Sequence, residues 1–243
     1  MLAEKPIQLI HHYSQFPDTG QAIENPNGLL AVSEQLNSDW LLASYRKGIF
    51  PWYSIGEPVL WWTPNPRAVL YTREFKLHRS LRKAIGKCAR NAQQRITLNH
   101  VFEQVMRGCA APREDGLSTW ITEDIIASYT DLHRRGFAHS VEHWIGDQLM
   151  GGLYCVAIGN MVFGESMFSQ QTDASKIAFA YFVAWLKQQG VRIIDCQQST
   201  RHLRSLGAVA VSREHFETEL AAELTGHGPN WRPQVLEWSH DAT

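Results

Sequence analysis

The sequence predicts an α+β protein, with a mixed sheet flanked by helices and a small irregular lobe at the amino terminus. Residues 138–167 contain three strand-like runs joined by Gly-Asp and Gly-Asn turns, a pattern typical of an antiparallel meander. Residues 173–196 change to a long helical pattern followed by an apolar strand. The preceding turn-rich stretch has only one convincing helix. We therefore predict a lobe of residues 1–71 and a domain of residues 72–243.

The helix expected in the lobe runs from about Ser38 to Lys47. Ser38 is a favourable N-cap, and Gly48 is a favourable residue to end the helix. Its buried face is expected to hold four large apolar side chains, those of Trp40, Leu41, Leu42 and Tyr45.

Three helices and a strand are expected at the start of the larger domain. A short basic helix covers residues 79–89, a strand covers residues 95–99, and a second helix covers residues 101–109. Thr122 caps a third helix, with acidic residues in its first turn and arginines in its last. This charge distribution complements the helix dipole at both ends.

The rest of the domain alternates between sheet and helix. The meander strands are expected at residues 138–145, 148–158 and 161–167, and the long helix at residues 173–189. An apolar strand over 191–196, a helix over 199–206, a strand over 208–211 and a helix over 213–224 complete the prediction.

This order of elements is that of the Gcn5-related acyltransferase fold, in which two central strands separate and the acyl donor enters the gap. The order predicts acyl transfer to an amine. An acetyl-CoA enzyme usually has a glycine-rich pyrophosphate loop before the long helix. Residues 168–174 at that junction contain no glycine, which disfavours CoA. An acetyl-CoA-dependent N-acetyltransferase remains the alternative function.

The composition favours a cytoplasmic protein without a metal site. No stretch approaches the roughly 20 apolar residues that span a bilayer, and residues 1–12 lack a signal-peptide pattern. The four cysteines show no metal-ligand spacing, so they are expected to be buried free thiols. The net charge of -1 argues against a protein that coats nucleic acid indiscriminately.

Polar residues at the ends of two strands are the candidate catalytic groups. Asp195 and Gln197 end an apolar strand, and residues two apart in an extended chain face the same side. Both are therefore expected to point into the cleft. Glu165 is an acid among apolar residues, a costly placement unless it is paired, ligated or used in catalysis. Alternatively, Asp195 caps the next helix and Glu165 pairs with an arginine.

A stripe of apolar side chains accompanies these groups. Phe179, Phe182 and Leu186 follow i, i+3, i+7 spacing and share one face of the long helix. Such stripes usually form core, but one that lines a cavity would accept a bulky apolar side chain. The candidate pocket residues are Leu153, Met167, Phe179, Phe182, Leu186 and Ile194.

Two further patterns suit nucleic acid. Residues 45–53 and 60–67 combine prolines, aromatic rings and arginines, which suits either a stacked nucleotide or a small aromatic core. The stretch between Glu74 and Glu103 contains seven Lys and Arg residues and no acid, which favours phosphate contact over an ordinary solvated face. A non-catalytic RNA-binding protein would share these patterns but would not need paired polar groups at strand ends.

Motifs spread along nearly the whole chain resemble those of the bacterial leucyl/phenylalanyl-tRNA–protein transferases. They are NPNGLL at 25–30, YRKGIFPW at 45–52, WWTPNPR at 61–67, TWI at 119–121, GESMFS at 164–169, and DCQ at 195–197 with HL at 202–203 and SLG at 205–207. The resemblance implies a two-lobed, cofactor-free, monomeric enzyme. It would transfer Leu, Phe or Met from aminoacyl-tRNA to proteins that begin with Arg or Lys, marking them for degradation under the N-end rule.

The same resemblance implies roles for individual residues. Asp195 and Gln197 would form the catalytic pair, and Glu165 would help to place the acceptor. Tyr45, Trp52 and Trp120 would contact the terminal adenosine of the tRNA; Leu153, Met167, Phe179, Phe182, Leu186 and Ile194 would shape the pocket for the transferred side chain; Arg79, Arg82 and Lys83 would meet the acceptor stem.

Overall fold

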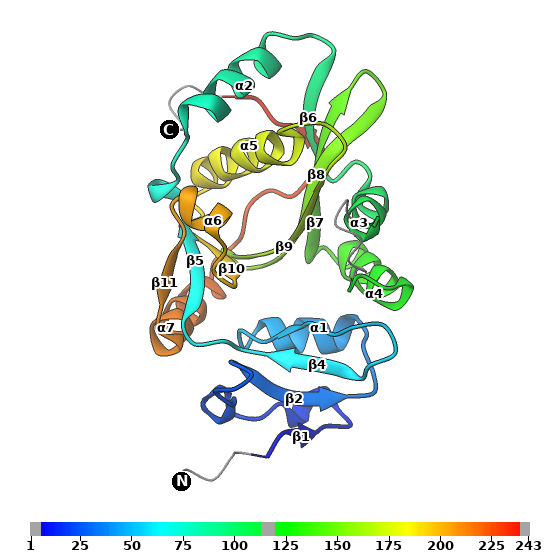
Figure 1. Ribbon diagram of the computed structural model, residues 1–243, viewed down its shortest axis with the longest axis vertical. Helices are drawn as coiled ribbons and strands as arrows, with labels where there is room; N and C mark the ends of the chain where they lie inside the picture. Colours follow the sequence, from blue (N-terminus) through cyan, green and yellow to red (C-terminus); the bar gives the residue numbers. More distant parts are fainter. Residues whose placement is uncertain (1–5, 113–119, 239–243) are drawn as a thin grey trace.

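The computed structural model describes residues 6–112 and 120–238 and confirms the predicted α+β class (Figure 1). Thr119, in one of the motifs above, lies outside the described residues. The larger part of the molecule is an eight-stranded mixed sheet with the order β11-β5-β10-β9-β8-β7-β6-β12. Its strands are β5 (Arg67–Tyr71), β6 (Gln94–Leu98), β7 (Ala138–Ile145), β8 (Gln148–Ile158), β9 (Met161–Ser169), β10 (Ile193–Gln197), β11 (Val209–Val211) and β12 (Gln234–Val235).

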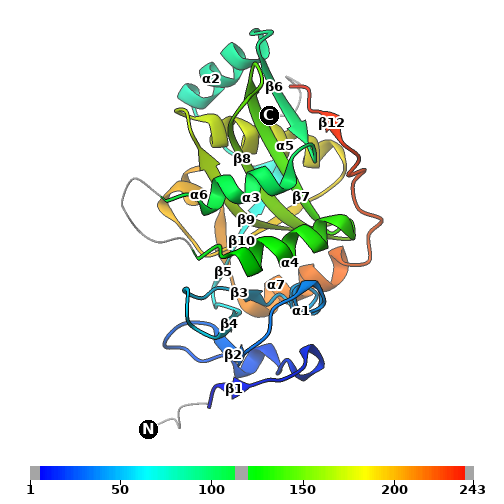
Figure 2. The same ribbon diagram turned by 90° about the vertical axis from the view of Figure 1, so that its right-hand side faces the viewer.

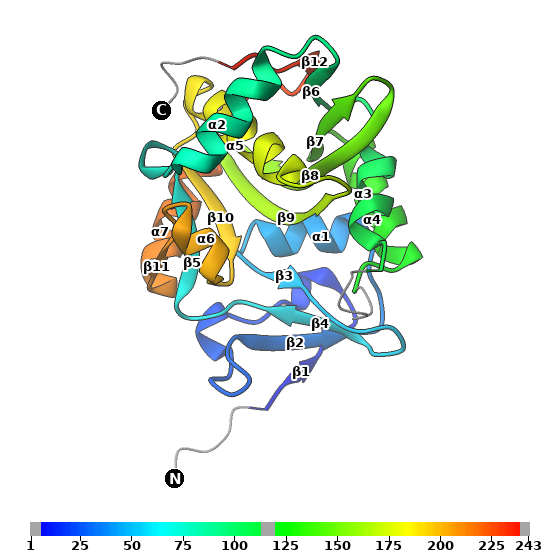
Figure 3. The ribbon, with the colours of Figure 1, turned by 45° about the horizontal axis from the view of Figure 1, so that its top comes forward.

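The central strands separate as predicted. Strands β7, β8 and β9 form the expected antiparallel meander. Strand β10 runs parallel to β9, and in the described residues they pair only at Ile194 with Val162 and at Asp195 with Phe163. Because β9 continues to Ser169 without β10 beside it, a gap opens between the two strands (Figure 3).

Helices cover both faces of this sheet. Figure 2 shows α3 and α4 over the face opposite α5. The helices are α2 (Arg79–Ala89), α3 (Phe102–Ala110), α4 (Glu123–Arg134), α5 (Ala174–Gln188), α6 (Arg201–Ser205) and α7 (Arg213–Glu223). On β8, Tyr154, Val156 and Ile158 pack with α3, α4 and α7. The alternate residues Leu153, Cys155 and Ala157 pack with α2 and α5. Alternate side chains of β8 therefore pack into two separate cores, one on each face of the sheet.

The small lobe is more regular than the sequence predicts. It contains a four-stranded sheet in the order β1-β2-β4-β3, made of β1 (Gln8–Leu9), β2 (Leu29–Ser33), β3 (Phe50–Pro51) and β4 (Val59–Trp62). These strands are too short to show a clear alternation of apolar and polar residues in the sequence. Buried aromatic rings pack against them. The rings of Trp40 and Trp61 lie parallel with centroids 5.8 Å apart, and Phe16 meets Trp61 edge-on.

Helix α1 (Ser38–Tyr45) joins the lobe to the domain. Its N-cap is Asn37 rather than the predicted Ser38, because the Asn37 side chain accepts hydrogen bonds from two backbone amides of the first turn. Trp40 faces the lobe, whereas Leu41, Leu42 and Tyr45 belong to the core of the larger domain. The chain passes from one sheet to the other between β4 and β5, and the domain division at residue 71 stays a prediction.

Over the described ranges, none of the helices is both long enough and apolar enough to span a membrane. None of the four cysteines, all of which lie in the described ranges, forms a disulfide; Cys88, Cys109 and Cys155 are buried, and Cys196 is half-buried.

Candidate active site

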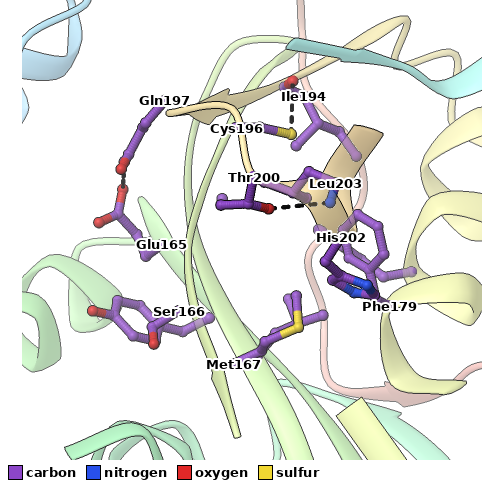
Figure 4. Close-up of a pocket in the computed structure, with 14 residues that line it drawn as sticks. Glu165, Ser166, Met167, Phe179, Ile194, Cys196, Gln197, Thr200, His202 and Leu203 are labelled. Atoms are coloured by element: carbon purple, nitrogen blue, oxygen red, sulfur yellow. Dashed lines mark hydrogen bonds between the residues drawn. The ribbon is translucent and has the colours of Figure 1, made fainter. Parts of the chain in front are cut away.

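A cavity of about 380 Å³ occupies the gap between β9 and β10 (Figure 4). Five of the six predicted pocket residues line it, namely Leu153, Met167, Phe179, Phe182 and Ile194. The prediction for Leu186 is wrong, because this side chain is fully buried in the core between α5 and the sheet. The i+7 member of the stripe thus points past the cavity. We call this cavity the side-chain slot.

Several residues of the slot were not predicted to line it. They are Tyr154, Gly164, Ser166, Cys196, Thr200, His202 and Leu203. His202 and Leu203 stand in one of the motifs quoted above, but no periodicity of their own places them in a pocket. Only the short helix α6, folded back over the strand ends, brings them there.

A second cavity of about 540 Å³ lies where the lobe meets the domain, and we call it the aromatic cavity. Two of the three residues predicted to contact adenosine, Trp52 and Trp120, line it together with Tyr53 and Trp62. Trp52 is 46% exposed, so its ring is available to a ligand.

Tyr45 lies away from the aromatic cavity, and its predicted contact with adenosine stays a prediction. Its side chain is fully buried, and it lines neither the side-chain slot nor the aromatic cavity. Its hydroxyl instead bonds Glu165 and Tyr129.

The two cavities adjoin. Five residues line both of them: Glu165, Cys196, Gln197, Thr200 and Leu203. A ligand with an apolar side chain in the slot and an aromatic base in the second cavity would therefore carry its connecting atoms past the Glu165 carboxyl and the Gln197 amide.

Asp195 does not point into the cleft with Gln197, so that prediction is wrong. Its side chain is fully buried, and Arg67 contacts both carboxylate oxygens, Nε to Oδ1 at 2.8 Å and Nη2 to Oδ2 at 2.6 Å. The Arg67 guanidinium lies between the rings of Phe50 and Phe216, 4.9 and 4.5 Å from their centroids. Asp195 is thus sealed inside the protein.

A bulge in β10 explains the difference. The register with β5 shifts between Asp195 and Gln197, and Gln197 adopts a left-handed backbone with φ of 60°. Residues two apart therefore no longer face the same side. The Gln197 backbone N–H donates to Asp195 Oδ1 at 2.8 Å, so the carboxylate holds this backbone in place and caps no helix. The cap of α6 is Thr200.

Gln197 and Glu165 form a direct pair where the two cavities meet. Gln197 Nε2 donates to Glu165 Oε1 at 2.9 Å (Figure 4). The same carboxyl accepts hydrogen bonds from the hydroxyls of Tyr45 at 2.6 Å and Tyr129 at 3.2 Å. Within residues 6–112 and 120–238, no arginine forms an ion pair with Glu165, unlike the alternative considered above. Burial raises the pKa of Glu165 to about 8, although the hydrogen bond from Tyr45 opposes this shift.

The amino terminus of α5 is closed by protein groups. Ser169 Oγ accepts a hydrogen bond from the Ser175 backbone N–H at 2.9 Å. Gly151 lies so close that a Cβ there would stand 2.7 Å from the Cβ of Ala174. The Ser175 amide is therefore already bonded within the protein and not open to a pyrophosphate, which further disfavours CoA.

Arg79, Arg82 and Lys83 lie on the exposed side of α2, which packs against α5 through its other face (Figure 3). Among the described residues, none of the three forms an ion pair with an acid. They do not line either cavity, and their contact with an acceptor stem stays a prediction.

Known proteins resemble the chain over most of its length. The family model described as leucyl/phenylalanyl-tRNA protein transferase matches residues 69–221, and that of its N-terminal domain matches residues 34–65. The leucyl/phenylalanyl-tRNA–protein transferase of Bordetella avium is 49% identical over 231 residues, which cover 93% of this chain and 92% of the relative. That of Hydrogenovibrio crunogenus is 53% identical over 209 residues, covering 86% and 80%.

Among solved structures, a GCN5-related N-acetyltransferase from Kribbella flavida matches 76% of this chain and 65% of its own, with 9% identity and a TM-score of 0.36. A likeness this weak carries no argument about the reaction.

Proposed function

This chain belongs to the leucyl/phenylalanyl-tRNA–protein transferase family, and on that premise we propose that it transfers Leu, Phe or Met from aminoacyl-tRNA to the N-terminal α-amine of proteins beginning with Arg or Lys. The enzyme is an aminoacyltransferase whose substrates are an aminoacyl-tRNA and a protein. We place this reaction in the cytoplasm, as a step that marks proteins for degradation. We propose that it acts as a monomer, with residues of one chain lining both cavities.

One observation carries this proposal: an apolar slot and an aromatic cavity adjoin at Glu165 and Gln197. The amino-acid side chain would fill the slot, and the terminal adenosine would stack in the aromatic cavity on Trp52 or Trp120. The ester bond that joins them would then lie beside the Glu165 carboxyl, where the incoming amine must also arrive.

The reaction forms a peptide bond and breaks an ester bond. The amine nitrogen attacks the ester carbonyl carbon, the bond to the ribose oxygen breaks, and one proton moves from nitrogen to that oxygen. The pKa of Glu165, about 8, is close to the 7.7–8.0 of an α-amine, so proton exchange between the two is nearly balanced. We assign Glu165 the role of proton carrier, which refines its expected role in placing the acceptor.

Positioning supplies the rest of the rate enhancement. Holding two reactants in the correct orientation lowers the activation free energy by about 7–11 kcal/mol in favourable cases. The donor ester is already activated. Gln197 is the candidate group that orients the amine or the carbonyl, since its amide stands at the meeting point of the cavities. Asp195 acts as a positioning residue, because it reaches the site only through the Gln197 backbone.

We expect the Trp52→Ala variant to bind a donor analogue about 1–3 kcal/mol more weakly, because a base stacked on the indole loses its platform. The measurement is the Kd of a non-hydrolysable aminoacyl-adenosine. Trp144→Ala is the matched control, because its ring contacts Arg95 and lies outside both cavities. Equal affinity of the Trp52 variant and the parent enzyme would remove Trp52 from the adenosine site.

We expect the triple substitution of Arg79, Arg82 and Lys83 by Ala to weaken tRNA binding and to flatten its salt dependence. Each lost phosphate contact lowers the slope of log K against log salt by about 0.7–0.9. Arg134→Ala, an exposed arginine at the end of α4, serves as control. A slope that the triple variant leaves unchanged contradicts the acceptor-stem assignment.

The decisive test supplies the protein with labelled Leu-tRNA and a peptide that begins with Arg. Transfer of label to the peptide α-amine, with none to an N-acetylated peptide, supports the proposal. A parallel reaction with labelled acetyl-CoA tests the alternative, and acetylation without leucyl transfer would overturn the proposed function.

A further inference from the structure

A histidine lies at the end of the side-chain slot that is remote from the reacting groups. His202 comes from α6, and its ring lies beside Phe179 and near Met167, whereas Glu165 and Gln197 stand at the opposite end (Figure 4). A side chain that enters the slot from the ester would direct its tip toward this imidazole.

The His202 imidazole differs from the other enclosed histidines of the protein. His133, His139 and His143 each have a hydrogen-bond partner for a ring nitrogen. Within residues 6–112 and 120–238, no hydrogen bond is found for the ring of His202, which is half-buried. The ring lines the slot beside apolar residues such as Phe179 and Met167, so its nitrogens are available to a ligand there.

The surroundings of the imidazole favour its neutral form. Burial lowers the pKa of His202, and the positive charge of Lys176 on α5 lowers it further. A neutral imidazole offers one N–H donor and one acceptor nitrogen without placing a charge against an apolar substrate. The slot can therefore hold a Leu or Phe side chain and still offer a hydrogen-bond partner at its far end.

We propose that His202 contacts the tip of the transferred side chain and extends the donors accepted by this enzyme to tyrosine, whose hydroxyl it hydrogen-bonds. This inference rests on the proposed function and concerns the same slot. If this end of the slot were purely apolar, the buried tyrosine hydroxyl would have no hydrogen-bond partner, which costs binding free energy. A hydrogen bond to the imidazole avoids that cost. Phenylalanine has no polar tip, so its transfer does not need the ring nitrogens.

The test charges one tRNA body in turn with Phe, Tyr and Leu and measures kcat/KM for transfer to a peptide beginning with Arg. We expect the parent enzyme to transfer Tyr, and His202→Leu to lower the ratio of Tyr to Phe about tenfold or more, with Phe changed less than about threefold. His202→Gln, which keeps a donor and an acceptor, should restore much of the ratio. Ser205→Ala, on the same short helix but outside the slot, should leave it unchanged.

The outcomes separate this inference from the proposed function. If the parent enzyme transfers Phe and Leu but not Tyr, or if His202→Leu keeps the parent ratio of Tyr to Phe, the role of His202 is rejected and the proposed function stands. If no donor is transferred, the proposed function itself fails. His202→Phe, which fills the space with a ring that has no nitrogen, covers the case in which the Leu variant does not fold.

Discussion

The Arg67→Met variant is expected to lose about 3–5 kcal/mol of its free energy of unfolding. Arg67 and Asp195 have almost no solvent exposure, and their ion pair has an N–O distance of 2.6 Å. Removing the cation leaves a buried carboxylate without its partner, which is far more costly than losing a surface pair. Urea unfolding at pH 7, followed by tryptophan fluorescence, measures the difference.

A double variant separates loss of charge balance from loss of packing. Arg67→Met combined with Asp195→Leu removes both charges and keeps apolar volume beside Phe50 and Phe216, so it should recover part of the lost stability. It should not recover activity, because the Gln197 backbone has lost the oxygen that holds it. A single variant that loses less than about 1 kcal/mol would contradict the assignment of this pair as a structural anchor.

The Glu165→Gln variant is expected to slow single-turnover transfer by about 10²–10⁴-fold at saturating donor and acceptor. This is the usual contribution of a positioned acid or base, and the amide keeps the shape of the side chain while losing its proton exchange. Glu142→Gln is the matched control. It too replaces a buried carboxyl with a raised pKa, about 7, but Glu142 bonds Thr97 and Ser140 on β6 and β7 and lines neither cavity.

The pH dependence sharpens the same test. The Glu165 carboxyl loses its proton as the pH rises through about 8, so its basic form becomes scarcer below that value. Dividing the parent rate by that of Glu165→Gln cancels the titration of the peptide amine. The quotient should rise about tenfold from pH 6 to pH 7. A quotient that does not change with pH would exclude Glu165 as the proton carrier.

Local patterns predicted most of the larger domain. The helix over Arg79–Ala89, the Thr122 cap and the three meander strands all appear within a residue or two of their expected bounds. Their signals lie within short windows of the chain, as caps, turn residues and periodicity. The sheet of the small lobe was missed because its strands are short and depend on rings such as Trp40 and Trp61, which meet only after folding.

The structure agrees with only part of the predicted site, again because some contacts form only after folding. Five of the six predicted residues line the slot, and their contact with a transferred side chain stays a prediction. Tyr45 and Leu186 are large apolar residues of the same kinds as those that line cavities, and only packing sends them into the core. Nothing in the sequence distinguishes them from their neighbours.

The sequence by itself determined the family, the α+β class, and the residue types at two strand ends. Only the tertiary structure decided what those residues do. The bulge at Gln197 turns Asp195 toward Arg67, 128 residues away in the chain, and leaves Gln197 with Glu165 where the two cavities meet. The local sequence does not determine whether such a carboxylate is buried or exposed. Burial requires a cation that compensates the charge, and this cation lies on another strand of the sheet.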